Sequence, residues 1–263
     1  MSYQFDGKGA IVTGASSGIG RGIALRFAEL GVKVVLSARR EEELEKVAQE
    51  IRAKGGQAVV AAADVTSPES VTAVVQTAVD ELGGIDIMVN CAGVAGPMTF
   101  EETPPERIRQ HIEVNYLGAV EFVRNVLPHM KSRESGYILN ISSMSGLKGL
   151  PTYVSYGASK FALTGFSDAL RHEVKKYGIQ VSVAAPPGVH TPMVDDHLES
   201  HADWFHKFNI MEVDKVVDRL VAGMRRGRFL ILMSADTKFM YAMVRHFPRV
   251  FTRLMVWLYG MEK

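Results

Sequence analysis

The stretch Thr13-Gly14-Ala15-Ser16-Ser17-Gly18-Ile19-Gly20 decides the fold of this chain. It follows a short apolar run at residues 10–12 and precedes a helical pattern that continues to about residue 30. A glycine-rich turn between a strand and a helix lets the backbone approach a phosphate, and the free N–H groups and helix dipole attract the anion. The residues of this turn expected to contact a bound dinucleotide are Gly14, Ser16, Ser17, Gly18, Ile19 and Gly20.

Beyond this turn, short β-branched runs alternate with longer helical patterns. The expected strands are residues 10–12, 33–37, 57–62, 86–90, 137–141, 180–184 and 229–232. The expected helices after the first are residues 41–54, 68–82 (with Ser67 as N-cap and Pro68 at its first position), 105–131, 153–177 and 213–225. This alternation predicts an α/β fold, a Rossmann-like doubly wound parallel sheet of about seven strands. We expect one domain over residues 1–234 and a helical extension over residues 235–263.

Composition excludes several classes of protein. Of the 263 residues, 47 % are hydrophobic and 22 % charged, which is typical of a folded protein and not of a disordered one. The net charge of +1 does not indicate a nucleic-acid surface. Cys91 is the only cysteine and no His, Asp and Glu cluster has ligand spacing, so neither a disulfide nor a metal site is expected. Without a visible secretory signal or spanning segment, we expect a cytoplasmic location, with any membrane contact peripheral.

The spacing Gly-x-x-x-Gly-x-Gly resembles the cofactor turn of the short-chain dehydrogenase/reductase family. The resemblance covers residues 5–233 and continues through Asn90-Cys91-Ala92-Gly93, Asn115, Ser143, Tyr156-Gly157-Ala158-Ser159-Lys160 and Pro187-Gly188 with Thr191. Cys91 departs from the family, which usually has a second asparagine there, and we expect it to be a small buried side chain near the cofactor. The further cofactor contacts that the resemblance implies are Asn90, Ala92, Gly93, Pro187, Gly188, Val189 and Thr191.

The end of the second expected strand indicates which nicotinamide cofactor is used. NAD-preferring folds place a carboxylate there for the adenine ribose, whereas this chain has Ala38 followed by Arg39 and Arg40. A guanidinium can hold a 2′-phosphate in a bidentate manner, so we expect NADPH rather than NADH. Alternatively, both arginines pair with the glutamates at residues 41–43. Asp64 and Val65 resemble the family's adenine-contacting position, although Asp64 is equally typical of a turn before a helix.

Tyr156 and Lys160 are four residues apart in a helical pattern and therefore share one face. A nearby lysine cation is expected to lower the pKa of the phenol, which suits a general acid or base near neutrality. Ser143 ends the fifth expected strand; Ser142 is its rival, but alternation directs it to the other face. The resemblance implies that Tyr156 donates a proton to a carbonyl oxygen, Ser143 orients that oxygen, Lys160 holds the nicotinamide ribose, and Asn115 joins a water relay.

These features predict an NADPH-dependent oxidoreductase that reduces an apolar ketone, acyl-, sphingoid- or steroid-like, to a secondary alcohol. The residues expected near the substrate are Val94, Met98, Phe100, Met193, Trp204, Phe205, Phe208, Ile210 and Met211, although these could instead pack a lid helix on the body. One alternative is a 3-oxoacyl-[acyl-carrier-protein] reductase, which generally lacks such an extension. Another is a non-catalytic NADP-sensing protein. The basic, aromatic extension resembles that of lipid-ketone reductases such as 3-ketosphinganine reductases and hydroxysteroid dehydrogenases.

The two longest expected helices carry apolar residues beyond one stripe, and in the family such helices pair in a four-helix bundle. We therefore expect a homodimer or homotetramer. In the extension, Arg245, Arg249 and Arg253 recur every four residues, and Pro248 should bend or restart the helix. Residues 235–259 therefore suit a membrane interface as a basic amphipathic segment. They suit equally well packing on the chain's own core or across a dimer.

Overall fold

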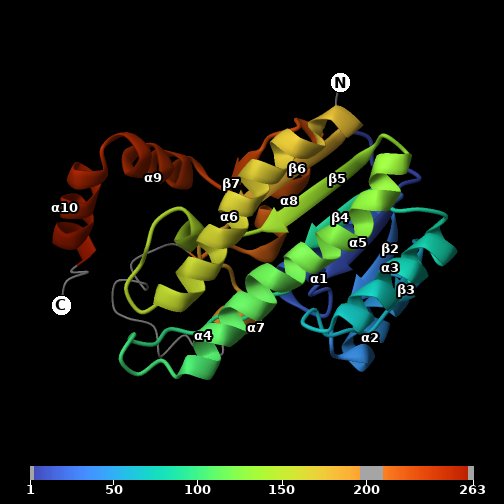
Figure 1. The fold of residues 1–263 in the computed structure, drawn as a ribbon, viewed down its shortest axis with the longest axis horizontal. Helices are drawn as coiled ribbons and strands as arrows, with labels where there is room; N and C mark the ends of the chain where they lie inside the picture. The colour runs from blue at the N-terminus through green and yellow to red at the C-terminus, as the bar shows by residue number, and fades with distance from the viewer. Residues whose placement is uncertain (1–2, 196–209, 260–263) are drawn as a thin grey trace.

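A computed structural model of the chain describes residues 3–195 and 210–259 (Figure 1). Its centre is one parallel sheet of seven strands in the order β3-β2-β1-β4-β5-β6-β7. The strands are β1 (Gly9–Thr13), β2 (Lys33–Ser37), β3 (Ala58–Val60), β4 (Ile87–Asn90), β5 (Gly136–Ile141), β6 (Ile179–Ala185) and β7 (Leu230–Leu232). The prediction of a doubly wound, Rossmann-like α/β fold is confirmed, and the predicted strands differ from these mainly at their ends.

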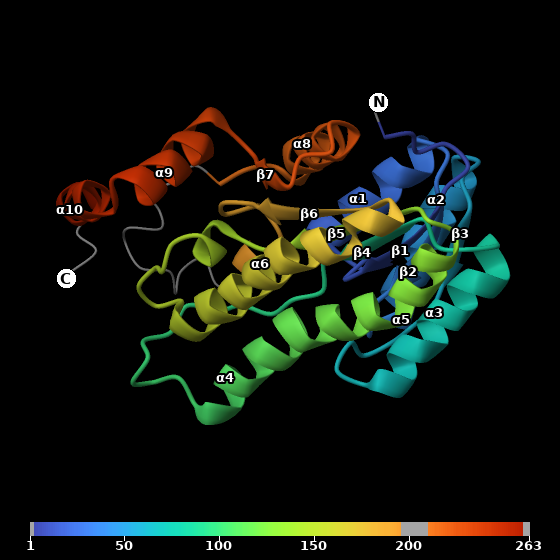
Figure 2. The same cartoon turned by 45° about the horizontal axis from the view of Figure 1, so that its top comes forward.

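Helices cover both faces of the sheet, as Figure 2 shows. The helices are α1 (Gly18–Glu29), α2 (Glu41–Ala53), α3 (Pro68–Leu82), α4 (Pro105–Ile112), α5 (Gly118–Ser132), α6 (Val154–Val174), α7 (Pro192–Asp195), α8 (Val213–Arg225), α9 (Ala235–His246) and α10 (Pro248–Tyr259). Helices α1, α2 and α8 pack on one face, and α3, α5 and α6 pack on the other. The central strands are buried on both sides, which explains their nearly continuous apolar sequences.

The order of the strands places a crevice at the carboxyl ends of β1 and β4. Strand β1 pairs with β2 on one side and with β4 on the other. Successive strands are therefore added toward one edge of the sheet before this point and toward the opposite edge after it. Open α/β sheets bind their ligands at such a switch point, because the loops leaving the two neighbouring strands turn away from each other. The glycine-rich turn and the segment after β4 therefore meet at one edge of the sheet.

The long helix expected over residues 105–131 is not a regular α-helix. A five-residue π-helix (Glu113–Leu117) separates α4 from α5, and Asn115 lies within it. Asparagine is a poor former of regular helix, and wider π turns occur often at functional sites.

The extension forms two helices, as its pattern predicted. Helix α9 begins with a capping box in which Ser234 Oγ accepts a hydrogen bond from the Thr237 N–H at 3.1 Å. It ends at His246, and Pro248 starts α10, because a proline cannot continue the preceding hydrogen-bond ladder. Within the described residues, no helix combines the length and the hydropathy needed to cross a bilayer.

Candidate active site

The glycine-rich turn has a backbone that only glycine suits. Gly14 and Gly18 have φ angles of +66° and +53°, in the left-handed region. A Cβ atom on Gly14 would lie 2.9 Å from the backbone nitrogen of Ala92, and one on Gly18 would lie 2.9 Å from a methyl carbon of Thr191. Ser17, the N-cap of α1, makes no capping bond with its side chain, so the first N–H groups of the helix remain available. The turn is therefore a cradle that could hold an anion.

Buried oxygen atoms at the same edge of the sheet also fit a polar ligand. Ser37 Oγ at the end of β2 and Asn90 Oδ1 at the end of β4 have no hydrogen-bond partner among the described residues. Thr13 Oγ1 accepts hydrogen bonds from the backbone of Cys91 (3.0 Å) and Ala92 (3.1 Å), which brings the segment after β4 against β1. Because unsatisfied buried oxygens are rare, these residues suit a dinucleotide lying across the strand ends.

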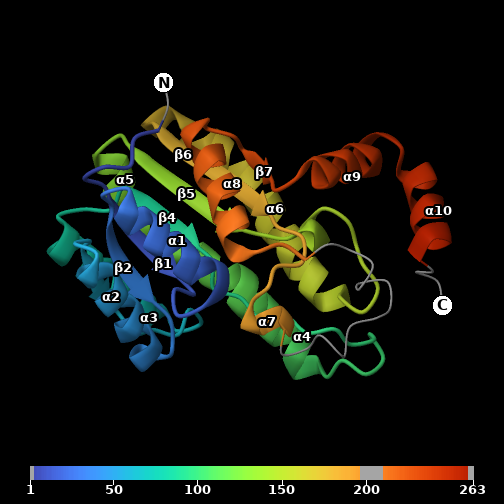
Figure 3. The ribbon, with the colours of Figure 1, turned by 180° about the vertical axis from the view of Figure 1, so that it is seen from behind.

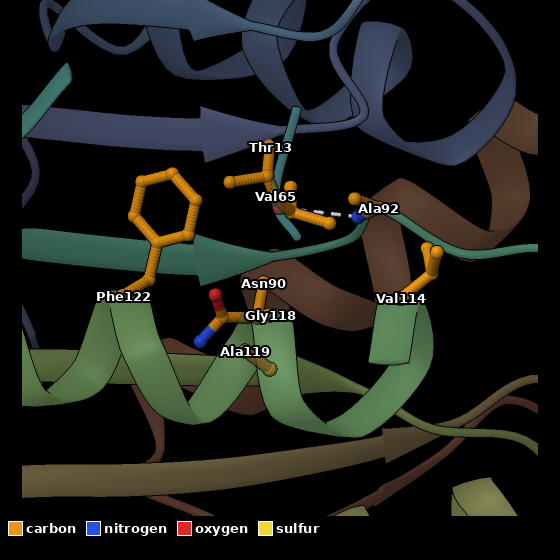
Figure 4. A pocket seen from close by; sticks show the side chains of 8 residues that line it. All are labelled: Thr13, Val65, Asn90, Ala92, Val114, Gly118, Ala119 and Phe122. Atoms are coloured by element: carbon orange, nitrogen blue, oxygen red, sulfur yellow. Dashed lines mark hydrogen bonds between the residues drawn. The ribbon is translucent and has the colours of Figure 1, made fainter. Parts of the chain in front are cut away.

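A small cavity of about 10 Å³ lies at this edge. Figure 4 shows the side chains that line it. Its lining residues are Thr13, Val65, Asn90, Ala92, Val114, Gly118, Ala119 and Phe122. Sequence reasoning missed Gly118, where a Cβ would lie 2.8 Å from Val65 Cγ2. Helix α5 can therefore approach the loop after β3 only with glycine at this position.

Arg40 lies across the glycine-rich turn. Its Nη2 donates hydrogen bonds to the hydroxyls of Ser16 (3.1 Å) and Ser17 (3.2 Å). The alternative in which Arg40 forms an ion pair with the following glutamates is not observed among the described residues, and Glu43 pairs with Lys46 instead. The turn, β2 and the start of α2 therefore meet around a guanidinium that solvent can reach.

Asp64 occupies the turn before α3, as the alternative reading of this residue proposed. Its Oδ1 accepts hydrogen bonds from the backbone N–H (2.9 Å) and the hydroxyl (2.7 Å) of Thr66. These bonds lower the pKa of the Asp64 carboxyl, and the positive charge of Arg39 adds to the effect. Arg39 therefore lies on the same rim as Arg40, near the expected adenosine end of the crevice.

The expected catalytic residues come together at the carboxyl end of β5 and the start of α6. Ser143 follows β5, and its hydroxyl lies near enough to the phenol of Tyr156 to affect the pKa of that group. Ser142 turns the other way, and its hydroxyl donates to the backbone carbonyl of Lys160 at 3.0 Å. The alternation expected for the two serines is therefore observed, and Ser143 is the one on the side of the tyrosine.

The pKa of the Tyr156 phenol and its relation to Lys160 differ from the expectation. Burial raises the pKa of the Tyr156 phenol, and the neighbouring Ser143 hydroxyl opposes the rise only in part. The expectation that Lys160 lowers this pKa is wrong for this structure. Lys160 Nζ lies 5.8 Å from the centroid of the Tyr156 ring and donates to the carbonyl oxygen of Ile141 at 2.8 Å. Burial lowers the pKa of Lys160 itself to about 8, because removal from water disfavours its cation.

Asn115 is held on three sides by the surrounding chain. Its Oδ1 accepts from the backbone N–H of Val94 at 2.8 Å, and its Nδ2 donates to the Val94 carbonyl and to Ser159 Oγ, both at 3.0 Å. A Cβ on Gly93 would lie 3.2 Å from Asn115 Oδ1 and 3.5 Å from Lys160 Nζ. The π-helix, the segment after β4 and α6 therefore converge on one buried polar centre.

Sequence reasoning missed His111, which lies four residues before Asn115. It is 2 % exposed, its Nδ1 is 2.8 Å from Ser155 Oγ, and its ring packs edge-on against Tyr156 with the centroids 6.1 Å apart. Burial lowers its pKa to about 4, with the charges of Arg107 and Lys160 adding to the effect. The imidazole is therefore neutral at pH 7. Its spacing from Asn115 on one helix was the available sequence signal.

The loop after β6 closes the crevice over the glycine-rich turn. Val189 pairs with Met211 in an isolated parallel bridge, and Thr191 Oγ1 donates to the Val189 carbonyl at 3.1 Å. His190, considered as a second acid, lies with its Nδ1 3.3 Å from Asp195 Oδ1 on an exposed surface. Pro187 and Gly188 lead into this loop, and Gly188 accepts a hydrogen bond from the Met211 N–H at 2.9 Å.

The described part of the expected substrate region is apolar and accessible. Met98, Phe100 and Met193 are 40 %, 61 % and 40 % exposed. Trp204, Phe205 and Phe208 were also expected there, but they lie outside the described residues.

Comparison with known proteins places the chain in a family. The sequence profile of the family described as short chain dehydrogenase matches residues 8–202. A 3-dehydrosphinganine reductase of Danio rerio is 40 % identical over 194 residues, which are 72 % of this chain and 58 % of that protein.

Two solved structures are also similar. One is a short-chain dehydrogenase/reductase from Burkholderia phymatum in complex with NAD, with a TM-score of 0.82, 25 % identity, and coverage of 92 % of this chain and 96 % of that one. The other is a 7α-hydroxysteroid dehydrogenase with NADH and 7-oxo glycochenodeoxycholic acid, with a TM-score of 0.77, 28 % identity, and coverage of 88 % and 94 %.

The chain belongs to the short-chain dehydrogenase family. The chain spans little more than half the length of the 3-dehydrosphinganine reductase that it matches.

Proposed function

We propose that this protein reduces an apolar ketone to a secondary alcohol with NADPH. The observation that carries the proposal is the meeting of Tyr156 with Lys160, whose Nζ lies 5.8 Å from the centroid of the phenol ring and donates to the Ile141 carbonyl at the end of β5. Burial raises the pKa of the phenol. A phenol that stays protonated at neutral pH is suited to donate a proton, and donation is what carbonyl reduction requires of a general acid.

The nicotinamide, when bound, supplies the hydride that adds to the carbonyl carbon. Tyr156 donates its proton to the carbonyl oxygen, and the Ser143 hydroxyl orients that oxygen by a hydrogen bond. Lys160, buried one helical turn beyond the tyrosine, holds ribose hydroxyls and provides positive charge as the phenolate forms. Asn115 keeps the segment after β4 in place through its two bonds to Val94.

Two arginines on the rim support NADPH as the cofactor. Arg40 already bonds the hydroxyls of Ser16 and Ser17, and Arg39 acts on Asp64, so both guanidinium groups lie at the expected adenosine end. Ala38 leaves that position without a carboxylate to repel a 2′-phosphate. The two solved relatives contain NAD and NADH, so cofactor preference needs a direct measurement.

The exposed apolar side chains after β4, together with the 3-dehydrosphinganine reductase relative, favour a lipid-like ketone as substrate. A 3-oxoacyl-[acyl-carrier-protein] reductase remains the second candidate. A sensor without turnover is disfavoured, because Tyr156, Ser143, Lys160 and Asn115 are all present and brought together.

A screen of purified protein for NADPH oxidation tests the proposal, using sphingoid, steroid, acyl-thioester and small aromatic ketones. We expect turnover with at least one apolar ketone, and slower turnover when NADH replaces NADPH. Tight NADPH binding without turnover on any ketone would favour the sensor. Turnover restricted to acyl thioesters of carrier protein would favour the second candidate.

We also infer a homo-oligomer built on α5 and α6. Leu117 at the end of the π-helix and Val154 and Phe161 on α6 are 48 %, 51 % and 43 % exposed. Such apolar exposure on neighbouring helices is costly in water, and a second copy related by a twofold axis would cover it.

A further inference from the structure

Helices α9 and α10 leave the body of the protein after β7 and lie at one end of the molecule (Figures 1 and 3). They lie on the side toward which the carboxyl ends of the strands point. Lys148, in the segment after β5, donates a hydrogen bond to Thr252 Oγ1 of α10 at 3.3 Å. The extension therefore sits beside the segment that leads from Ser143 to α6, near the side where a substrate would enter.

Helix α10 has two apolar faces, of which the described chain covers only one. Phe251 and Met255, four residues apart, are 4 % and 6 % exposed. Val250 and Trp257, on the other face, are 57 % and 78 % exposed, and Leu254 between them is 36 % exposed. The buried face anchors the helix to the protein, so the exposed face is free to bind something else. We call Val250, Leu254 and Trp257 the outer stripe.

Positive charge accompanies the outer stripe. Arg249 and Arg253 lie one turn apart on α10, and Lys238 and Arg245 lie on α9. The sequence contains no Asp or Glu between Lys238 and Gly260. Among the residues that the structure describes, no carboxylate pairs with Arg249 or Arg253, and Arg245 donates only to the hydroxyl of Tyr241 at 2.9 Å. Within the described part of the chain, these cations therefore have no carboxylate partner and can attract an anionic surface.

We propose that the outer stripe and its arginines bind the surface of an anionic lipid membrane. An amphipathic helix of this kind lies in the interface, with the aromatic and aliphatic residues among the acyl chains and the arginines at the headgroups. Phe247 (58 % exposed) at the α9–α10 junction and Phe239 (63 % exposed) on α9 extend the apolar surface. A second copy fits less well, because a twofold contact through α10 would bring the arginines of both copies together.

The position of α10 gives this binding a consequence for the reaction, which rests on the proposed reduction of an apolar ketone. The bond between Lys148 and Thr252 couples the membrane-facing helix to the segment beside Ser143. A bound membrane would then lie close to the substrate side of the crevice. The substrate class is therefore an apolar ketone dissolved in the bilayer, which reaches the site without crossing water.

Sedimentation with vesicles tests the surface, using the full chain without substrate. We expect binding to phosphatidylcholine vesicles that contain phosphatidylserine, little binding to pure phosphatidylcholine, and weaker binding in high salt. The double variant Arg249→Glu/Arg253→Glu should lower the affinity at least about tenfold, because headgroup attraction becomes repulsion. Lys215→Glu/Arg219→Glu makes the same change of charge on exposed positions of α8 and should bind like the wild type.

The apolar contribution has its own variant, Val250→Ser/Trp257→Ser, which keeps every charge and should also weaken binding. Far-UV circular dichroism and turnover of a water-soluble ketone show that each variant is folded and separate this test from that of the proposed reaction. Wild-type protein that ignores anionic vesicles, or charge-reversed protein that binds them unchanged, would overturn the proposal. An oligomer that dissociates in the variants, together with no vesicle binding by the wild type, would assign the surface to a second copy.

Discussion

Lys160 and Arg40 are both cations beside the crevice at the carboxyl ends of the strands, but their environments are opposite. Lys160 is 5 % exposed, bonds the Ile141 carbonyl, and has a pKa lowered to about 8 by burial. Arg40 is exposed and donates hydrogen bonds to the hydroxyls of Ser16 and Ser17. At the buried centre, removal from water sets the pKa values of the side chains, so a small substitution there should change the rate of turnover strongly. At the exposed rim, solvent screens charge, so substitutions there should alter the preference between NADPH and NADH more than the rate of turnover.

The largest effect is expected at the buried centre. Tyr156→Phe removes one oxygen and the proton that it carries, and should slow turnover roughly 10²–10⁴-fold. Binding of NADPH and the unfolding temperature should change little, because the ring still fills its place beside His111 and Tyr153. Tyr116→Phe, on the π-helix, is a matched control that should retain wild-type turnover. A Tyr156→Phe rate above about a tenth of wild type would remove the tyrosine from the role of acid.

The burial of His111 should also make the free energy of unfolding depend on pH. Its folded pKa is about 4, whereas an unfolded histidine titrates near pH 6.5. Between these values the unfolded chain binds the additional proton, so stability is full above pH 6.5 and falls as the pH approaches 4. The loss attributable to this group should reach about 3 kcal/mol.

His111→Gln cannot titrate at this position. The free energy of unfolding, measured with urea between pH 7 and pH 4.5, should therefore depend less on pH in this variant than in the wild type. His172→Gln, on the exposed surface of α6, should leave the profile as it is. Equal pH dependence in His111→Gln and the wild type would mean that another group carries the effect.

A smaller effect is expected at the rim. Arg39→Asp places a carboxylate where it can accept ribose hydroxyls and repel a 2′-phosphate. The ratio of kcat/KM for NADPH to that for NADH should fall about tenfold or more, with little change in stability. Arg40→Ser, which removes the contacts to Ser16 and Ser17, should weaken NADPH binding less. If the ratio is unchanged in Arg39→Asp, Arg39 does not contact the 2′-phosphate. The contact then belongs to Arg40, or the phosphate does not bind at this rim.

The smallest effect on turnover is expected on the outer surface of α5 and α6. Phe161 follows Lys160 in α6, but it is 43 % exposed whereas Lys160 is 5 % exposed. Phe161→Glu should dissociate the oligomer, because a charge would be buried in the apolar contact. Light scattering would show the smaller species, while circular dichroism and NADPH turnover per chain should stay close to wild type. Wild-type protein that is already monomeric at micromolar concentration would contradict the inferred contact.

Several elements were predictable because their signals are local. Gly14 and Gly18 indicate a left-handed turn wherever a strand meets a helix in this way, and the spacing of Tyr156 and Lys160 puts both on one face of any helix. Ser67 and Pro68 mark the start of α3 at the predicted residue. The alternation of strands and helices predicts a parallel sheet, because each crossover must return along the same face.

Other properties depended on contacts between residues far apart in the chain. The π turn at Asn115 holds the backbone of Val94, His111 meets Ser155 across two helices, and Arg40 folds back over Ser16. The pKa of Tyr156 rises rather than falls because burial, which no spacing reveals, outweighs the effect of the Ser143 hydroxyl. Likewise, the sequence alone determined that residues 235–259 are helical, basic and amphipathic. Only the tertiary structure decided that Phe251 and Met255 are buried while Trp257 faces outward, because exposure depends on which surface the rest of the chain covers.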